Sequence, residues 1–194
     1  MSRFAGVGHA AHLLLLLSPT WWLAGWAGID AGLAIFAAAV LFAGILESEA
    51  ARKNLGENRS TAEDLVAIRV ARWVGVGLLL TFWLAQWERL QHPAGWLGPF
   101  AGGLLFSAGV FLRVAAIHTL GSRFVSDIRA QGSRVREGVY AWLRHPSECG
   151  LLLIATGGPL LAGAPRTALL AGALLAPVSY WRTRREDAAW RSGD

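Results

Sequence analysis

Long apolar runs alternate with short polar stretches along the whole chain, and this alternation predicts its elements. Four apolar segments lie in the first two thirds of the chain, at residues 10–27, 31–46, 65–87 and 96–117. Each approaches the roughly 20 residues that a helix needs to cross a bilayer. The first run begins like a signal peptide but leads directly into the second, so we interpret it as a retained span. The polar segment 47–64 is expected to be a solvated connector.

The last apolar segment, residues 149–181, is too long for one span. Gly163-Ala164-Pro165-Arg166 divides it, because proline removes a backbone donor and ends the preceding helix. We therefore predict a C-terminal helical hairpin. Four N-terminal spans over 10–117 and a catalytic part over 118–194, made of a loop, the hairpin and a last helix, then form one domain over 1–194. The predicted fold is all-α, a polytopic membrane bundle of five to six transmembrane helices.

Composition and charge agree with a membrane protein. Hydrophobic residues make up 54% of the chain and charged residues 16%, whereas soluble domains carry about 25% charged residues. The net charge of +5 would suit nucleic acid, but the basic residues cluster at the ends of apolar segments, so we expect no nucleic-acid partner. The single cysteine, Cys149, excludes a disulfide framework. The histidines are scattered over different spans, so no metal site is expected.

Basic residues gather on one predicted side of the membrane. Six spans place both termini on that side. It carries most of the basic residues, namely Arg3, Arg52, Lys53, Arg59, Arg123, Arg129, Arg134, Arg136, Arg144, Arg182, Arg184, Arg185 and Arg191, whereas the other side carries Arg89 and Arg166. The positive-inside rule then predicts that both termini are cytoplasmic. The composition, rich in Ala, Arg and Gly and poor in Lys, resembles that of a high-GC bacterium, which suggests a bacterial inner membrane.

Candidate chemistry is concentrated at Gly138–Gly150, which reads GVYAWLRHPSECG. Charged side chains here stand at the mouth of an apolar helix, where charge is expensive and is more often functional than decorative. A hairpin brings its two ends together, so the segment that follows it, with Arg182 and Glu186, should lie beside this motif. Topology therefore predicts one polar cluster at the membrane surface, made of His145, Ser147, Glu148, Arg182 and Glu186.

The motif resembles that of the isoprenylcysteine carboxyl methyltransferase (ICMT) family and, more broadly, of membrane-bound relatives such as phospholipid N-methyltransferases. The resemblance covers about Gly121–Trp190. It rests on the Arg-His-Pro core with Gly138, Tyr140 and Gly150, and on the later segment YWRTRREDAAW. It implies a methyltransferase that uses S-adenosyl-L-methionine from a cytoplasmic pocket. It also implies a lipophilic acceptor that enters from the membrane lipids, a prenylcysteine-type carboxylate in this family.

The resemblance also implies roles for individual residues. Cofactor positions would fall at Arg129, Gly132, Ser133, Arg134, Val135, Tyr140, His145, Pro146, Ser147, Glu148 and Glu186. Arg182 matches the arginine assigned to the substrate, and the catalytic set would be Arg182, Glu186, His145 and Glu148. These residue types suit the cofactor, because arginine binds carboxylates in a bidentate manner and an aromatic face attracts a cation. Arg182 and Glu186 are four residues apart and so share a helix face.

The chain departs from the family at Glu148, where the family usually has tyrosine, and at Arg129 and Arg134, where it often has glutamine and leucine. Glu148 would replace a ribose contact or act as a base for a phenol or amine. The acceptor thus stays open among a prenylcysteine-type carboxylate, a phospholipid amine, a phenolic lipid and a thiol. A non-catalytic membrane protein and a nicotinamide-dependent reductase of the sterol-reductase type are the alternative classes.

Several motif residues also have plain structural interpretations. Ser147 is expected to be the N-cap of a helix that begins near Cys149. Arg184 and Arg191 are expected to anchor the chain at the interface. Two interpretations are open for Gly157-Gly158-Pro159. The segment either serves helix packing or widens a lateral opening for a lipid, and the sequence favours neither. His118 is expected on the same side of the membrane as the pocket.

Overall fold

The structure is a computed structural model that describes residues 14–25, 31–54, 65–92, 95–121 and 135–192. A first helix runs over Leu14–Ala24. It is followed by α2 (Ala31–Asn54), α3 (Leu65–Gln91), α4 (Leu97–Leu120), the 3-10 helix η3 (Gly138–Ala141), α5 (Pro146–Leu161) and α6 (Pro165–Ser192). No strand occurs in these ranges, so the predicted all-α class is confirmed for the described part of the chain.

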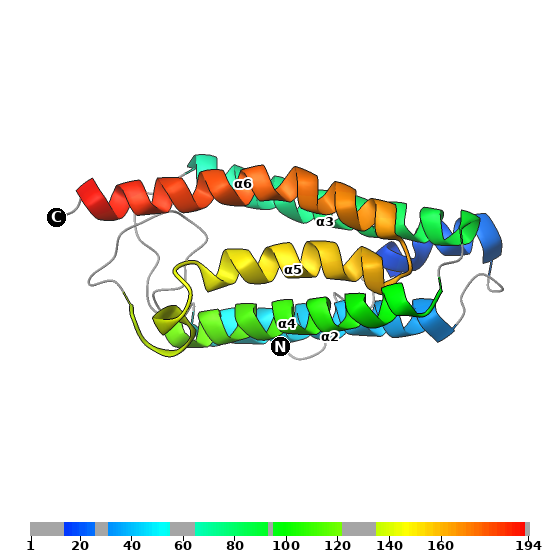
Figure 1. The fold of residues 1–194 in the computed structure, drawn as a ribbon, viewed down its shortest axis with the longest axis horizontal. Helices are drawn as coiled ribbons and strands as arrows, with labels where there is room; N and C mark the ends of the chain where they lie inside the picture. Colours follow the sequence, from blue (N-terminus) through cyan, green and yellow to red (C-terminus); the bar gives the residue numbers. More distant parts are fainter. Residues whose placement is uncertain (1–13, 26–30, 55–64, 93–94, 122–134, 193–194) are drawn as a thin grey trace.

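The long helices run side by side along the length of the molecule (Figure 1). Helix α5 lies in the middle, packed against α4 on one side and α6 on the other, and α3 accompanies α6. The predicted C-terminal hairpin is confirmed, because α5 and α6 are antiparallel and joined by the turn Ala162–Ala164. One end of the bundle thus gathers the end of α4, η3, the start of α5 and the last turns of α6.

The predicted connector 47–64 is wrong in its first part. Helix α2 continues without interruption to Asn54, and residues 55–64 lie outside the described residues. The segment from Glu47 to Lys53 reads ESEAARK, and glutamate, alanine, arginine and lysine are strong helix formers. Loss of the apolar pattern therefore ended the predicted span at residue 46 but did not end the helix.

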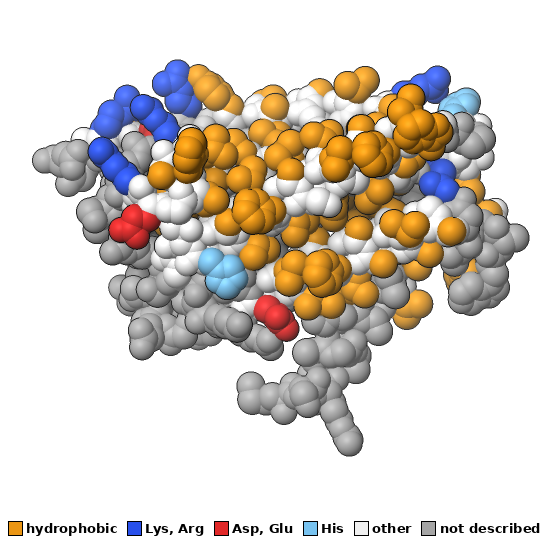
Figure 2. All heavy atoms as spheres, turned by 60° about the horizontal axis from the view of Figure 1, so that its bottom comes forward, with side chains coloured by type: hydrophobic (Ala, Val, Ile, Leu, Met, Phe, Trp, Pro, Cys, Tyr) orange, Lys and Arg blue, Asp and Glu red, His pale blue; other side chains and the backbone are white. Residues whose placement is uncertain are grey.

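An apolar surface covers the middle of the bundle on the face that Figure 2 shows. Arginine or lysine side chains appear toward the two ends of that face. Of the described helices, α4 is long and apolar enough to cross a membrane, with 24 residues and a mean hydropathy of 1.9. Leu14–Ala24 and Ala31–Leu46 are shorter apolar helices. Association with a membrane fits these features, while the count of five to six spans and the side of the termini stay predictions.

Helices α4 and α5 approach each other closely through glycines. A Cβ added to Gly109 of α4 would lie 2.7 Å from the carbonyl oxygen of Gly150 of α5. A Cβ on Gly102 would overlap the backbone nitrogen of Leu161. Small residues let helix backbones meet in this way, as is common between helices in membranes. The interface therefore holds α5, and with it the motif at its start, against α4.

The segment Gly157-Gly158-Pro159 continues this interface. All three residues are buried. A Cβ on Gly157 would lie 2.5 Å from the backbone nitrogen of Phe106, and one on Gly158 would lie 2.6 Å from a ring carbon of Phe82. Of the two interpretations left open by the sequence, the structure agrees with helix packing, because neighbouring side chains and backbone leave no space there.

The last turn of α3 fixes the opposite end of the hairpin. The Glu88 carboxylate accepts hydrogen bonds from the backbone nitrogens of Arg166 at 3.0 Å and Thr167 at 2.8 Å, and from the Thr167 hydroxyl at 2.7 Å. A negative group at the N-terminus of α6 also interacts favourably with the helix dipole. Next to it, the Arg89 guanidinium donates to the carbonyl oxygen of Ala162 at 3.0 Å, at the end of α5.

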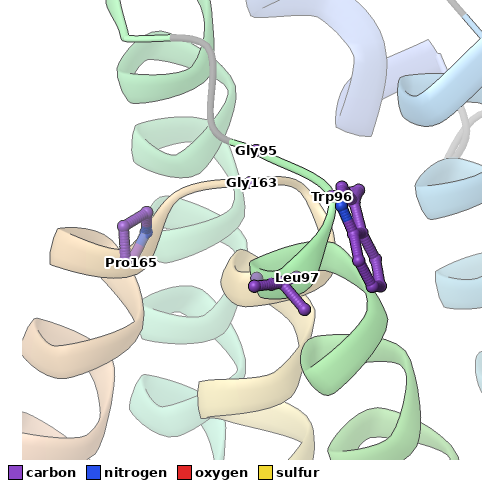
Figure 3. Close-up of a pocket in the computed structure, with 6 residues that line it drawn as sticks. Gly95, Trp96, Leu97, Gly163 and Pro165 are labelled. Atoms are coloured by element: carbon purple, nitrogen blue, oxygen red, sulfur yellow. The ribbon is translucent and has the colours of Figure 1, made fainter.

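A small apolar pocket lies beside this turn (Figure 3), at the opposite end of α5 from the polar motif. Helix α4 begins on one side of it, and the α5–α6 turn closes the other. Its lining consists of Gly95, Trp96, Leu97, Gly98, Gly163 and Pro165. None of these residues carries an ionisable side chain, so the pocket has no group for acid–base or nucleophilic chemistry.

Replacing Glu88 by glutamine should loosen the hairpin. The Glu88→Gln amide retains one acceptor oxygen and turns its nitrogen toward backbone donors, which leaves a buried N–H unpaired at a cost of about 1–3 kcal/mol. We expect the free energy of unfolding in detergent to fall by that amount when unfolding is followed by circular dichroism. Glu49→Gln, at an exposed position of α2, is the matched control. Equal stability of the two variants would contradict the capping role.

Candidate active site

The Arg-His-Pro turn is built by local backbone requirements. Gly138, which begins η3, has φ of +54°, a conformation that favours glycine. It also approaches α4 so closely that an added Cβ would lie 2.8 Å from the Thr119 hydroxyl. Pro146 is the first residue of α5, where its missing N–H is not needed. These two residues place the turn against α4. They also direct the first turn of α5, which carries Glu148, toward the end of α6.

The prediction for Ser147 is wrong. Helix α5 begins at Pro146, the N-cap position is His145, and no side chain caps the helix there. Proline already has the helical φ angle, so the helix starts three residues earlier than the apolar run suggested. Ser147 lies within the first turn, and its hydroxyl accepts a hydrogen bond from Arg113 Nη1 at 3.3 Å.

Ion pairs join the start of α5 to the last turns of α6. Arg182 Nη1 lies 3.1 Å from Glu148 Oε1, and the two side chains are 18% and 13% exposed. His145 Nδ1 lies 3.2 Å from Glu186 Oε2 with hydrogen-bond geometry. The other ring nitrogen lies 3.3 Å from Asp187 Oδ1, but without the geometry of a hydrogen bond, so that contact is electrostatic. The predicted meeting of the two segments is confirmed.

The environment of the cluster changes the acidity of two groups. The hydrogen bond to Glu186 is the main cause that raises the pKa of His145; the charges of Glu186 and Asp187 add to the rise, and burial opposes it. Burial raises the pKa of the Tyr140 phenol, with a further rise from the charge of Glu186 and a smaller opposing effect of Arg113. Tyr140 therefore keeps its proton and can donate a hydrogen bond within the cluster.

The structure adds two residues that the sequence reasoning missed. Arg113 reaches from α4 to the motif and contacts the carbonyl oxygen of Ser147 at 3.4 Å as well as its hydroxyl. The sequence did contain a feature that could have identified Arg113. It is the only charged residue in the apolar run 96–117, and a charge inside such a run indicates function. Asp187 follows Glu186 directly and was overlooked because the motif pointed only to its neighbour.

The other predicted residues are placed as follows. Pro146 is buried, and Val135 and Tyr140 are half-buried. Arg129, Gly132, Ser133 and Arg134 lie outside the described residues. His118 is exposed at the end of α4. Arg184 is exposed and lies over the Tyr180 ring at 5.2 Å, which suits an interfacial anchor. No three His, Cys, Asp or Glu residues in the described ranges form a group suited to a metal ion.

The cluster and the helices that carry it coincide with a known family. Residues 103–192 match the model of the isoprenylcysteine carboxyl methyltransferase (ICMT) family. This region is an ICMT-family domain. It comprises most of α4, η3, the hairpin and the whole of the ionic cluster. The ICMT family consists of membrane methyltransferases, so the predicted family is confirmed and the apolar helix α4 fits its location. A comparison with curated proteins gave no match.

The raised pKa of His145 predicts how stability changes with pH in this ICMT domain. The contribution of the charged pair is fully present below the ordinary histidine pKa of about 6.5. It is lost as the pH rises through the higher pKa of the folded state. Glu186 is 43% exposed, so solvent screening limits the effect to about 1 kcal/mol.

The measurement compares the unfolding free energies of wild type and His145→Asn between about pH 6 and pH 9, on either side of the histidine range. The difference between the two proteins should shrink toward high pH. His118→Asn, at the exposed histidine of α4, controls for loss of an imidazole. A difference that stays constant with pH would show that the pair does not stabilise the fold.

Proposed function

We propose that this protein is an S-adenosyl-L-methionine-dependent methyltransferase that acts at the membrane interface on a lipophilic acceptor. The proposal is carried by the ionic cluster within the ICMT domain, where polar atoms of opposite charge lie buried and incompletely paired. Glu148 Oε2 and Arg182 Nε are buried and have no hydrogen-bond partner among the described residues. Native proteins rarely leave buried polar atoms unpaired, so these atoms are suited to a polar ligand.

The residue types fit the chemistry of the cofactor. Its ammonium and ribose hydroxyls suit the carboxylate of Glu186, and its carboxylate suits a guanidinium. The ring of Tyr140 suits a cation or the adenine base. When bound, the cofactor supplies an electrophilic methyl group. His145 would hold Glu186 in place through the hydrogen bond between them, and the Tyr140 hydroxyl would remain a donor because its pKa is raised.

The protein's own contribution is then positioning and exclusion of water. Holding two reactants in line replaces a bimolecular encounter and can supply most of the rate enhancement, and a closed site removes competing hydrolysis. Arg113 ties the motif to α4 through Ser147, which keeps the start of α5 rigid. An acceptor that enters along the apolar helices would meet the cluster at the bundle end, where the exposed Trp142 suits the interface.

Location and orientation follow from the same proposal. The end of the bundle that carries the cluster also carries Arg144, Arg184, Arg185 and Arg191, so we place it at the cytoplasmic surface by the positive-inside rule. A cytosolic cofactor would reach it there directly. Both termini would then be cytoplasmic, and the bacterial inner membrane remains the expectation from composition.

Calorimetric titration with S-adenosylhomocysteine tests the core of the proposal. We expect saturable binding by the purified protein in detergent. Glu186→Gln should weaken it about tenfold or more, since it removes a charge-assisted contact of about 1.5–3 kcal/mol, whereas Glu49→Gln should not change it. Titration with NADPH examines the reductase alternative. Folded wild type that binds NADPH, or that does not bind S-adenosylhomocysteine, would refute the assignment.

A further inference from the structure

We propose that the acceptor of this enzyme is an uncharged lipophilic molecule with an O–H or S–H group, and that Glu148 is the catalytic base that removes its proton. The inference rests on the proposed function and concerns the same site. It departs from a carboxylate acceptor, which is already ionised and needs no base.

The arginine that would hold an anionic acceptor is already neutralised. Arg182 Nη1 lies 3.1 Å from Glu148 Oε1, and both side chains are largely buried. A carboxylate acceptor that approached Arg182 would also approach Glu148. Two carboxylates that share one poorly solvated site repel each other, and one of them is driven to take up a proton. The pair therefore favours an acceptor that brings no negative charge.

The other cations of the cluster do not offset the repulsion that a carboxylate acceptor would meet at Glu148. His145 lies between Glu186 and Asp187, with its two ring nitrogens 3.2 Å and 3.3 Å from their carboxylates. Together with Arg182 and Arg113, these residues make a cluster in which three cations face three carboxylates. Within this cluster the positive and negative charges are therefore equal in number.

Glu148 keeps one oxygen for the acceptor. Its Oε2 atom is buried and has no hydrogen-bond partner in the described part of the chain. At neutral pH a carboxylate acceptor has no hydrogen to donate to this atom, whereas a phenol or thiol has one. Burial of an unpaired oxygen is costly, so an O–H or S–H donor satisfies it. This oxygen sits at the position where the family usually has tyrosine, whose phenol is protonated at neutral pH and so does not act as a base.

The chemical step is balanced with Glu148 as base. The acceptor's O–H or S–H bond breaks while its oxygen or sulfur forms a bond to the methyl carbon. The bond between that carbon and the sulfonium sulfur breaks, and its electron pair remains on sulfur as a neutral thioether. The proton passes to Glu148 Oε2 and later to water. A positioned base of this kind typically contributes about 10²- to 10⁴-fold to the rate.

A binding measurement without cofactor tests the charge argument. The probe is 4-nonyl-2-nitrophenol, whose visible absorbance reports whether the phenol is ionised. Bound to wild type, its apparent pKa should be higher than in protein-free detergent micelles, because Glu148 disfavours the phenolate. Glu148→Gln leaves Arg182 without its anion and should lower the probe's pKa below the micelle value. Glu49→Gln should behave as wild type. A wild type that lowers the probe's pKa would overturn the proposal.

A methyl-transfer assay then compares acceptors. Wild type should methylate 4-nonylphenol or dodecanethiol at least about tenfold faster than N-acetyl-S-farnesylcysteine. Comparing the first two acceptors separates an O–H acceptor from an S–H acceptor. Glu148→Gln should lower the methylation rate about 100-fold. The unfolding midpoint of the variant establishes that it is folded, and titration with S-adenosylhomocysteine corrects the rate for any change in cofactor affinity. Glu148→Asp should retain part of the activity.

The possible failures are distinct. Preference for the prenylcysteine, or full activity of Glu148→Gln, would overturn the acceptor assignment while leaving methyl transfer intact. Absence of S-adenosylhomocysteine binding by folded wild type would overturn the proposed function itself.

Discussion

Arg182→Met is expected to abolish methyl transfer and to lower the free energy of unfolding by about 3 kcal/mol. The methionine keeps most of the volume of the arginine but leaves Glu148, which is 13% exposed, as a charge without its partner. Removing one member of a largely buried ion pair typically destabilises a protein by about 3–5 kcal/mol. Activity should fall at least about 100-fold, because a small displacement at a site of this kind has that effect.

A double-mutant cycle separates the two consequences. Arg182→Met combined with Glu148→Gln removes the unpaired charge, so stability should recover by about 2 kcal/mol while activity stays lost, because coupled pairs are not additive. Arg184→Met, at an exposed arginine on the same helix, should change stability by less than about 1 kcal/mol. If the Arg182→Met single variant is as stable as wild type in detergent unfolding, the ion pair does not hold α5 to α6.

Gly102→Ala is expected to be the most damaging small substitution at the interface between α4 and α5. Its Cβ would overlap the backbone nitrogen of Leu161, and backbone cannot turn aside as a side chain can. The two helices would have to separate, so we expect a loss of about 3 kcal/mol or more. Binding of S-adenosylhomocysteine should weaken as well, because the contact between α4 and α5 positions Arg113 beside Ser147.

Gly75→Ala is the matched control for this experiment. Gly75 lies in α3, and a Cβ there would meet no atom within 4 Å. Alanine is the better helix former by about 1 kcal/mol, so this variant should be as stable as wild type or slightly more stable. Circular dichroism during titration with a denaturing detergent compares the two. Gly102→Ala with wild-type stability would show that the close approach of the helices is unimportant.

Much of the fold could be predicted from residue patterns alone. The separation of the apolar runs 65–87 and 96–117 into two helices and the turn near Pro165 were both found at the expected places, because proline and the loss of apolar periodicity act locally. The same local reasoning failed at Glu47 and at Ser147. In the first case, polar residues with high helix propensity extended α2. In the second, Pro146 started α5 before the apolar run began.

The sequence by itself determined the helical class, the hairpin, the motif of the ICMT family and the two segments that meet. These depend on hydrophobic pattern, proline chemistry and chain connectivity. Only the tertiary structure decided which charges pair. Glu148 contacts Arg182, Glu186 contacts His145, and Arg113 reaches Ser147 from a third helix. The reason is that the register between helices depends on close glycine contacts such as Gly109 with Gly150, and a shift of one turn would exchange every partner.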